Sequence, residues 1–495
     1  MGRAREASRR LEQAEAALTA AAADQASLRR AAEKVRRAAE CLAGAHGGII
    51  DIASTLALPR ERMHQRLPRS STALDAARAE VFVRALGVHR AFIGGTAPQF
   101  RRNLNLALKM IGGEFRPEPS AALDLWATLA ILVPVLSSTF ASFGRCFAAV
   151  PAGGIGWLIV DEAGQAVPQH AVGALMRAKR ALVVGDPLQV EPVITLDEEV
   201  DRRLHQRRGA HPVHRSTATS TQVLADRNNT FGTWFAGSDK EVWVGSPLVV
   251  HRRCVEPMFS IANAIAYGGG MVLGDGKAEQ ERRATEGDPD RDAAPRPLLG
   301  PSRWIDMPTD RGGDRHFMPA HAEMAAAIVR EFMVRGWAEG ARPDGLPDLY
   351  VISPFRSAAH GLRGLLSSRR NWWAPGIQRK AVDAWLRASV GTVHTFQGKE
   401  AEAVILLLGG KAPGAIRWAA GTPNVLNVAV TRAKRRLYVV GDWDAWMREP
   451  RVRSAMGGIE GFRSSPEAVR TSMATPPALV SARPASMLAG RPQAS

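Results

Sequence analysis

The sequence is poor in cysteine and short of acidic side chains. Its 495 residues include only three cysteines, far apart in the chain and without any C-x-x-C spacing. These cysteines predict neither a zinc site nor a disulfide framework, and they fit a reducing cytoplasm. Lysine and arginine number 65 against 48 aspartates and glutamates, a formal net charge of +17. This surplus favours a polyanionic partner, nucleic acid above all, and Arg-rich codon usage in a GC-rich genome is the alternative explanation.

Long apolar runs are also scarce. The N-terminus is charged and alanine-rich and has no apolar h-region, so no secretory signal is predicted. One uncharged stretch, residues 125–143, approaches the length of a membrane span, but it contains a proline and several hydroxyl side chains. We interpret it as a short core helix followed by a strand over Val133–Ser138. The expected location is cytoplasmic, with no membrane partner.

The third absence is that of a glycine-rich phosphate cradle, G-x-x-x-x-G-K-[ST]. The Gly-Lys pairs at positions 276, 398 and 410 are followed by Ala or Glu, and none has a Gly five residues before its own. Such a loop supplies backbone N–H groups and a Lys to the phosphates of a nucleotide, and a hydroxyl to Mg²⁺. A nucleotide bound without it would lose all of these contacts.

The chain begins with a segment that has the composition of a long helix. Residues 3–40 are dominated by Ala, Arg and Glu and contain no Gly or Pro, which predicts an exposed or coiled-coil-like helix. We assign residues 1–120 to a helical stalk or insert. The Ser/Pro/Ala-rich residues 461–495 have few large apolar side chains and are expected to be disordered.

Between these ends, short apolar runs predict buried parallel strands, each ending in small or acidic residues. The runs occupy 133–139, 156–162 and 180–186 in the first half, and 349–355, 389–396, 401–409 and 435–442 in the second. Helical stretches separate them, including Val167–Arg180 and Phe317–Gly336. The fold class is therefore α/β with parallel sheets, in one domain over 121–247 and another over 248–460. Within them, 199–247 is expected to be an irregular connector and Glu281–Pro301 a loop.

Carboxylates follow one of these strands directly. Asp161 and Glu162 come after the apolar run WLIV, at the strand end where ligands bind in open α/β sheets. A strand-end Asp can hold Mg²⁺ directly or through water, and the neighbouring Glu can orient and deprotonate an attacking water. A second acidic group, residues 197–199, is interpreted as a solvated turn.

Five motifs in fixed order carry a resemblance. DEAGQA (161–166), GDPLQ (185–189), HRRCVEP (251–257), GTVHTFQGKE (391–400) and NVAVTRAKRRLYVVGD (427–442) look like motifs II to VI of superfamily 1 helicases. The closest branch is the Upf-like type, which acts on DNA or RNA. The match covers roughly residues 130–445. It implies two RecA-like domains, the first incomplete here, with ATP and Mg²⁺ in the cleft between them.

The resemblance assigns roles to individual residues. Asp161 would bind Mg²⁺, Glu162 would activate water, and Gln189 would sense the γ-phosphate. Two arginines would neutralise charge on the transferring phosphoryl group, where an arginine finger is worth ~10³–10⁵ in rate. These arginines are Arg253 and Arg432, with Gln165, Gly398 and Glu400 completing the nucleotide contacts and Glu400 facing the ribose.

Four hydroxyl side chains match positions that contact nucleic-acid phosphates in the family. They are Ser138, Thr139, Ser353 and Thr392. Such contacts give affinity without sequence readout. The competing interpretation is that each hydroxyl caps a nearby helix or turn.

The sequence also departs from the family pattern. His394 stands where an acid is common and Ala358 where a Gln is common. Arg252 precedes Arg253 where an aromatic is common, so Arg252 is the alternative to Arg253 as the finger. The missing cradle is the largest departure, and it would leave the run at 181–184 on an exposed sheet edge. A truncated gene model, a partner chain that supplies the loop and a degenerate ATPase are the three explanations.

We therefore predict the C-terminal portion of an ATP-dependent helicase or translocase that acts on single-stranded DNA or RNA and is inactive alone. The alternative is a non-catalytic nucleic-acid-binding or interaction module on a degenerate helicase fold.

Overall fold

The computed structural model describes most of the chain between residues 52 and 474. The described ranges are 52–65, 72–189, 191–236, 241–274, 301–309, 316–335, 346–369, 372–373, 377–396, 398–410, 412–421 and 423–474, together with residues 30, 33, 34 and 37. The predicted helix over 3–40, apart from those four positions, lies outside the described residues, as does the predicted loop over 281–300. No helix within the described ranges is long and apolar enough to cross a membrane.

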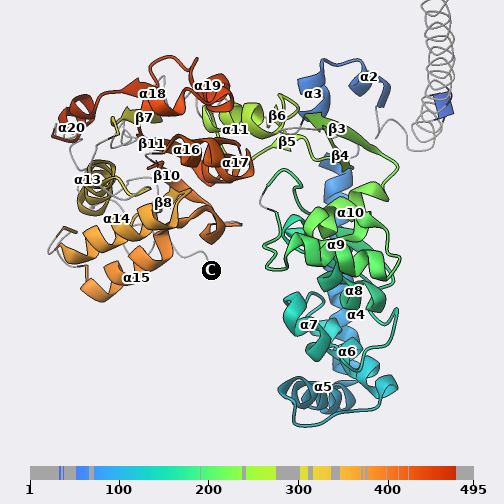
Figure 1. Cartoon of the computed structure of the whole chain (residues 1–495). Coiled ribbons are helices and arrows are strands. Elements are labelled where there is room, and N and C mark those ends of the chain that lie inside the picture. The colour runs from blue at the N-terminus through green and yellow to red at the C-terminus, as the bar shows by residue number, and fades with distance from the viewer. Residues whose placement is uncertain are drawn as a thin grey trace, which may run out of the picture. The chain divides into compact units, whose positions relative to one another are not determined.

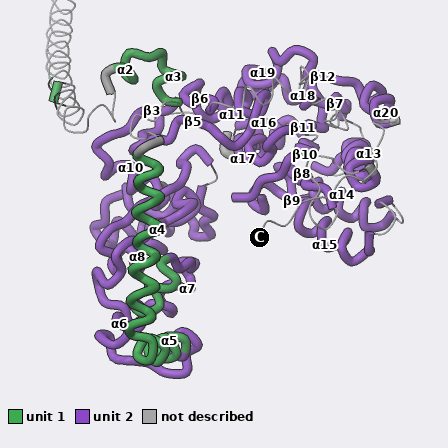
Figure 2. Tube along the Cα trace, turned by 180° about the vertical axis from the view of Figure 1, so that it is seen from behind, with its two compact units in different colours: residues 1–108, 128–134 green, residues 109–127, 135–495 purple. Residues whose placement is uncertain are grey.

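The chain divides into two units, of which the first is helical in its described part (Figure 2). It comprises residues 1–108 and 128–134. Its helices are α2 (Ile52–Leu56), α3 (Arg60–Gln65), α4 (Thr72–Gly95), most of α5 (Ala97–Gly112) and the end of α6 (Pro119–Leu132). The strand predicted over Val133–Ser138 is wrong, because these residues follow α6 without regular structure and Val135 is 76% exposed. A parallel strand needs a hydrogen-bonded neighbour, and none is present beside this run in the described part.

The second unit, residues 109–127 and 135–495, contains a small parallel sheet. Helix α7 (Phe140–Cys146) precedes β1 (Leu158–Val160), which pairs with β2 (Ala181–Val183) in register Leu158 to Ala181. The turn η1 (Ala163–Gln165) and helix α8 (Pro168–Arg177) connect the two strands. The apolar side chains of this sheet are poorly covered, with Ile159 62% and Leu182 51% exposed. Strand β2 has no second neighbour among the described strands, so the predicted exposed edge is confirmed.

The predicted irregular connector over 199–247 is wrong, because it is largely ordered. It contains α9 (Glu198–Arg207), η2 (Pro212–His214), η3 (Ser216–Ala218), α10 (Thr221–Arg227) and an antiparallel hairpin of β3 (Gly232–Ala236) and β4 (Glu241–Gly245). The acidic group at 197–199 is a helix start rather than a turn, since Asp197 caps α9 by accepting from the backbone N–H of Glu199 at 2.9 Å. Across the hairpin, Trp234 and Trp243 make an edge-to-face pair.

The second sheet has six parallel strands, in the order β12-β7-β11-β10-β8-β9. Their bounds are β7 (Arg303–Asp306), β8 (Leu349–Ser353), β9 (Val390–Thr392), β10 (Ala401–Leu407), β11 (Ala433–Gly441) and β12 (Arg463–Ser464). The four strands predicted in this half are confirmed, and with them the α/β fold class. Strands β7 and β12 were missed because they are too short to show a distinct apolar run.

Helices cover this sheet on both sides (Figure 1). On one side, α13 (Pro319–Arg335), α14 (Arg356–Ser368) and α15 (Arg379–Ser389) contact the strands, and on the other side α11 (Met258–Ala266) and α17 (Pro423–Thr431) do. Helices α16 (Pro413–Gly421), α18 (Trp443–Trp446) and α19 (Pro450–Met456) complete the second layer. Trp304, Trp385 and Trp446 are buried completely or almost so. This core, unlike that of the first sheet, is closed.

The end of the described chain is folded. Strand β12 extends the second sheet and helix α20 (Pro466–Ala474) follows it, with Phe462, Val469 and Met473 buried. The prediction of disorder from residue 461 is therefore wrong for this stretch. Single large apolar side chains spaced along a polar segment were enough to anchor it, which composition alone does not reveal. Residues 475–495 lie outside the described residues.

Candidate active site

The loop after β1 holds one of the two predicted carboxylates, Glu162, in a strained backbone conformation. Glu162 has φ 52° and ψ 39°, the left-handed region that non-glycine residues seldom occupy. Its backbone N–H donates to Asp161 Oδ1 at 2.9 Å, and its Oε2 accepts from Gln165 Nε2 at 3.0 Å. Asp161 itself is exposed. Strained backbone of this kind clusters at functional sites, where the surrounding structure holds it in place.

Two glycines let the loops after β1 and β2 touch. A Cβ on Gly185 would lie 2.8 Å from the backbone nitrogen of Ala163 and 2.9 Å from that of Gly164. A Cβ on Gly164 would lie 2.8 Å from the backbone oxygen of Asp186. Any side chain at either position would push the loops apart, because the opposing atoms are backbone. The predicted motifs II and III are thus packed directly against each other.

Asp186 is the centre of a hydrogen-bond network that reaches the second sheet. Its Oδ1 accepts from the Leu188 backbone N–H at 2.8 Å, and its Oδ2 accepts from Gln189 Nε2 at 3.0 Å and from the hydroxyl of Tyr267 at 2.5 Å. Asn427 Nδ2 in turn donates to the Tyr267 oxygen at 3.1 Å. Burial, followed by the Asp186 charge, raises the pKa of Tyr267 well above its ordinary value.

Tyr267 is a site residue that sequence reasoning missed. It stands at the C-terminal end of α11, outside every motif, and no spacing rule points to it. Its hydroxyl nevertheless links Asp186 in motif III to Asn427 in motif VI. The available signal was a tyrosine directly after the apolar segment MFSIANAIA, since the hydroxyl of a buried tyrosine needs a hydrogen-bond partner.

Arg432 is buried completely and fixed by backbone oxygens. Its Nε donates to the carbonyl of Val428 at 3.1 Å and its Nη1 to the carbonyl of Lys399 at 3.0 Å. Burial, followed by the nearby cation of Arg253, lowers the pKa of Arg432 to about 10, against the opposing charges of Glu162 and Glu400. The group remains a cation at neutral pH.

Arg253 and Glu400 complete the cluster of charges. Arg253 Nε lies 3.5 Å from Glu400 Oε2, and Lys434 Nζ lies 3.0 Å from Glu400 Oε1. Gly398 has φ +75°, a conformation that favours glycine, and a Cβ there would lie 3.6 Å from Glu162 Oε1. Glu162 therefore faces the segment that carries Gly398 and Glu400. The structure thus brings together residues predicted from four motifs: Glu162 (II), Arg253 (IV), Gly398 and Glu400 (V), and Arg432 (VI). Gln165 lies beside Glu162, and Gln189 lies beside Asp186.

The four hydroxyls predicted to contact nucleic acid lie in two places. Thr139 caps α7 by accepting from the backbone N–H of Ser142 at 3.3 Å, and the Ser138 hydroxyl donates to the Thr139 carbonyl. Ser353 and Thr392 are register partners at the ends of β8 and β9. Ser353 is buried and its Oγ accepts from the Phe355 backbone N–H at 3.2 Å. Thr139 and Ser353 therefore make local hydrogen bonds of the kind that the capping interpretation expects. Their contact with nucleic acid stays a prediction.

Comparison with family models defines the class of this protein. Two models, each described as an AAA domain, match residues 133–196 (AAA_11) and residues 243–444 (AAA_12). Together with the parallel sheets and the charges at their ends, they define a nucleotide-binding fold of the P-loop class. These two domains are typical of Upf-like superfamily 1 helicases, and the chain resembles that family over both matched ranges.

Solved structures of low similarity include the arterivirus nonstructural protein 10 helicase and the PRRSV helicase. The arterivirus protein in complex with DNA is 14% identical, with a TM-score of 0.26, over 59% of this chain and 41% of its own. A second structure of the arterivirus helicase is 14% identical, with a TM-score of 0.27, over 64% of this chain and 56% of its own. The PRRSV helicase is 12% identical, with a TM-score of 0.24, over 57% of this chain and 34% of its own. This chain thus spans about half or less of each of them, and no curated protein matches it.

Proposed function

We propose that this chain serves an ATP-dependent helicase or translocase that couples ATP hydrolysis to movement along a single nucleic-acid strand. The convergence of Glu162, Arg253 and Arg432 carries the proposal. These residues come from three motifs far apart in sequence. The charges of Glu162 and Arg253 both act on the buried guanidinium of Arg432. Two cations held in mutual repulsion at the end of a parallel sheet are suited to a phosphate group, whose negative charge would stabilise both.

The residues present fit one side of an ATP·Mg²⁺ site. Arg253 and Arg432 would neutralise charge on the transferring phosphoryl group, and Glu162 would accept the proton of the attacking water. Asp161, exposed at the end of β1, would hold Mg²⁺, which supplies further neutralisation of phosphate charge when bound. Gln165, Gln189, Gly398 and Glu400 would contact the nucleotide.

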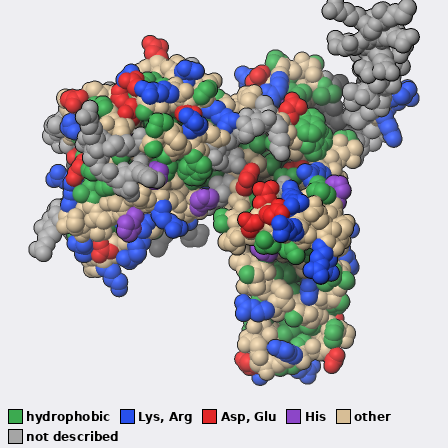
Figure 3. Space-filling view, in the orientation of Figure 1, with side chains coloured by type: hydrophobic (Ala, Val, Ile, Leu, Met, Phe, Trp, Pro, Cys, Tyr) green, Lys and Arg blue, Asp and Glu red, His purple; other side chains and the backbone are tan. Residues whose placement is uncertain are grey.

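The proposal for nucleic acid rests on charge and on the ends of two strands. The net charge of +17 favours a polyanion, and Lys and Arg side chains are spread over the face shown in Figure 3 rather than gathered in one patch. Ser353 and Thr392 stand side by side at the carboxyl ends of β8 and β9. Contacts of hydroxyls and cations with phosphates would bind a strand without reading its sequence.

A second candidate is a non-catalytic nucleic-acid-binding module. It is favoured by one sequence observation, that the 495 residues contain no G-x-x-x-x-G-K-[ST]. Without that cradle the β- and γ-phosphates lack their backbone N–H donors and their lysine. The two candidates share the nucleic-acid contacts and differ in whether ATP is bound and hydrolysed.

ATPase activity stimulated by single-stranded DNA or RNA separates the candidates. Glu162→Gln keeps the shape of the side chain and removes the base, so we expect it to abolish any activity of the wild-type chain. Glu198→Gln, in the exposed first turn of α9, is the matched control and should leave activity unchanged. Activity that survives Glu162→Gln would rule out the assigned role of Glu162. A wild-type chain that binds nucleic acid but neither binds nor hydrolyses ATP would support the non-catalytic module.

A further inference from the structure

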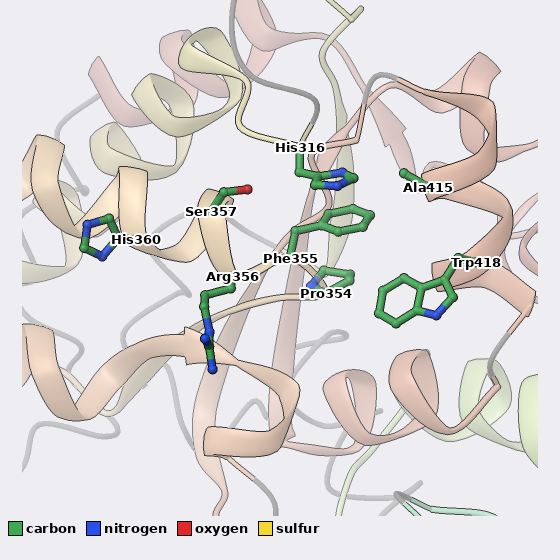
Figure 4. A pocket seen from close by; sticks show the side chains of 8 residues that line it. All are labelled: His316, Pro354, Phe355, Arg356, Ser357, His360, Ala415 and Trp418. Atoms are coloured by element: carbon green, nitrogen blue, oxygen red, sulfur yellow. The ribbon is translucent and has the colours of Figure 1, made fainter. Parts of the chain in front are cut away.

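A cavity of about 790 Å³ opens at the carboxyl ends of β8 and β10, apart from the cluster of charges described above. Its lining comes from the segment before α13, the start of α14 and the helix α16 (Figure 4). The lining includes His316, Phe355, Arg356, Ser357, His360 and Trp418. A cavity of this size accommodates a small planar ligand together with its substituents.

Aromatic rings form one side of the cavity. The His316 and Phe355 rings are stacked, with centroids 4.4 Å apart and planes within 7° of parallel. The Trp418 ring follows at 6.0 Å from Phe355 and is tilted by 39°. Trp418 is 55% exposed, so its ring is accessible to a ligand. In Figure 4, Trp418 lies on one side of Phe355 and the side chains of α14 lie on the other.

The backbone around the cavity is arranged to hold this stack. Gly409 and Gly410, directly after β10, have φ of +56° and +81°. A Cβ on Gly409 would lie 2.3 Å from the His316 carbonyl, and a Cβ on Gly410 would lie 3.1 Å from the Phe355 ring. The Gly410 backbone N–H donates to the His316 carbonyl at 3.2 Å. Two glycines in succession therefore allow His316 to approach closely and stack on Phe355.

Two buried polar atoms of the cavity lack hydrogen-bond partners in the described part of the chain. Within the described part of the chain, neither His316 Nδ1 nor Ser357 Oγ has a hydrogen-bond partner, although both atoms are buried. Buried polar atoms are normally satisfied, so a site that leaves two of them unpaired is suited to a ligand with a polar edge. Arg356 and His360, one helical turn apart on α14, add a guanidinium and an imidazole to the same lining.

We propose that this cavity binds one unpaired nucleobase of a single strand. The base would stack on the exposed ring of Trp418, beside the His316–Phe355 pair, and its edge would face the side chains of Ser357 and His316. Arg356 would contact the adjoining phosphate. Pro354 and Phe355 directly follow Ser353, so the base site would continue the strand-end surface of Ser353 and Thr392. This inference rests on the proposed nucleic-acid function and adds base stacking to it.

A proline-rich peptide is the other ligand that aromatic-lined grooves bind. The two unpaired polar atoms and the neighbouring cation favour the nucleotide, because a polyproline segment offers no N–H donor, no planar ring edge and no negative charge to match them. The peptide is therefore an outcome of the test and not part of the proposal.

The test measures binding of two labelled oligonucleotides by fluorescence anisotropy. One is oligothymidine of about twelve nucleotides, within the usual site sizes for single strands, and the other is the same backbone with abasic sites. We expect Trp418→Ala to weaken oligothymidine binding about tenfold to a hundredfold, as loss of one stacked base would, and to leave abasic binding unchanged. Trp234→Ala, a similarly exposed tryptophan at 59% on β3, is the matched control and should change neither.

Photocrosslinking gives an independent readout. Oligonucleotide carrying 5-iodouracil should crosslink to the peptide that contains Trp418, and Trp418→Ala should lose that crosslink. Thermal unfolding followed by circular dichroism establishes that the variant is folded, which the exposure of Trp418 leads us to expect.

The outcomes separate this inference from the proposed function. Equal weakening of both oligonucleotides by Trp418→Ala, or no weakening of either, would overturn the base site and leave nucleic-acid binding standing. A wild-type chain that binds neither oligonucleotide would overturn nucleic-acid binding itself. Binding of a proline-rich peptide that depends on Trp418, in place of base-dependent binding, would assign the cavity to a peptide.

Discussion

Arg432 is a charged side chain with no exposed surface, which is rare for arginine. Its guanidinium is held by the carbonyls of Val428 and Lys399, and so it joins α17 to the loop before β10. A side chain fixed in this way has lost its rotamer freedom during folding. It can therefore present its remaining N–H groups to a ligand at little further entropic cost.

Arg432→Ala should lower the free energy of unfolding, because the carbonyls of Val428 and Lys399 lose the Arg432 donors and the space of a buried side chain is left empty. We expect a loss of about 1–3 kcal/mol for the unsatisfied groups, measured by urea denaturation. Arg417→Ala, exposed on α16, is the control and should stay within about 0.5 kcal/mol of wild type. Equal stability of both variants would show that the bonds to Val428 and Lys399 contribute nothing to folding.

Asp226 gives the fold a dependence on pH. It is 3% exposed, and burial raises the pKa of its carboxyl above the ordinary value, with the Asp186 charge adding to the rise and hydrogen bonds from Gln222 and Gly245 opposing it. Because the folded pKa is the higher one, the folded state binds more protons between the two pKa values. The free energy of unfolding should therefore rise as pH falls through the folded pKa.

Asp226→Asn removes this ionisation. It should therefore flatten the dependence of the free energy of unfolding on pH in the acidic range just above the ordinary aspartate pKa. Urea denaturation of wild type and variant at successive pH values measures it. Identical slopes would show that Asp226 titrates alike in the folded and unfolded chain, contrary to this expectation.

At the scale of elements, the two parallel sheets differ in how they are covered. Strands β10 and β11 are buried along nearly their whole length, whereas β1 and β2 expose Ile159 and Leu182. Strand β2 also leaves one row of backbone N–H and C=O groups without a strand partner in the described structure. An apolar edge strand of this kind is a template for pairing with another chain.

Leu182→Lys should therefore reduce concentration-dependent association, measured by sedimentation velocity, with little effect on stability because the side chain is 51% exposed. Lysine is a common means of blocking edge pairing in natural sheets. Val172→Lys, 59% exposed on α8 and away from the edge, is the matched control. Association that Leu182→Lys leaves unchanged would exclude the β2 edge as its site.

The elements could be predicted from the sequence where the apolar runs were long. The runs at 349–355, 401–409 and 435–442 each became a strand, because a continuous apolar run can be stable only inside a sheet covered on both faces. The run at 133–138 has the same texture but did not become a strand. Strand formation depends on a neighbour, and a neighbour is not encoded in the run itself.

At the scale of the whole molecule, the excess of 17 positive charges should make nucleic-acid binding strongly dependent on salt. Phosphate contacts release counterions, so affinity should fall linearly on a log–log plot against salt concentration. With about 6–10 phosphate contacts the loss would be roughly 10³–10⁵ between about 50 and 200 mM salt. Fluorescence anisotropy with oligothymidine measures the slope, and a slope near zero would contradict a phosphate-dominated contact.

The sequence by itself determined the resemblance to Upf-like superfamily 1 helicases, the α/β fold class and the positions of the catalytic candidates. It could do so because these depend on short linear motifs and on runs of apolar residues. Only the tertiary structure decided which residues meet: Tyr267 with Asp186 and Asn427, and His316 with Phe355. Such pairs are joined by chain folding across tens to more than a hundred residues, and no local spacing records them.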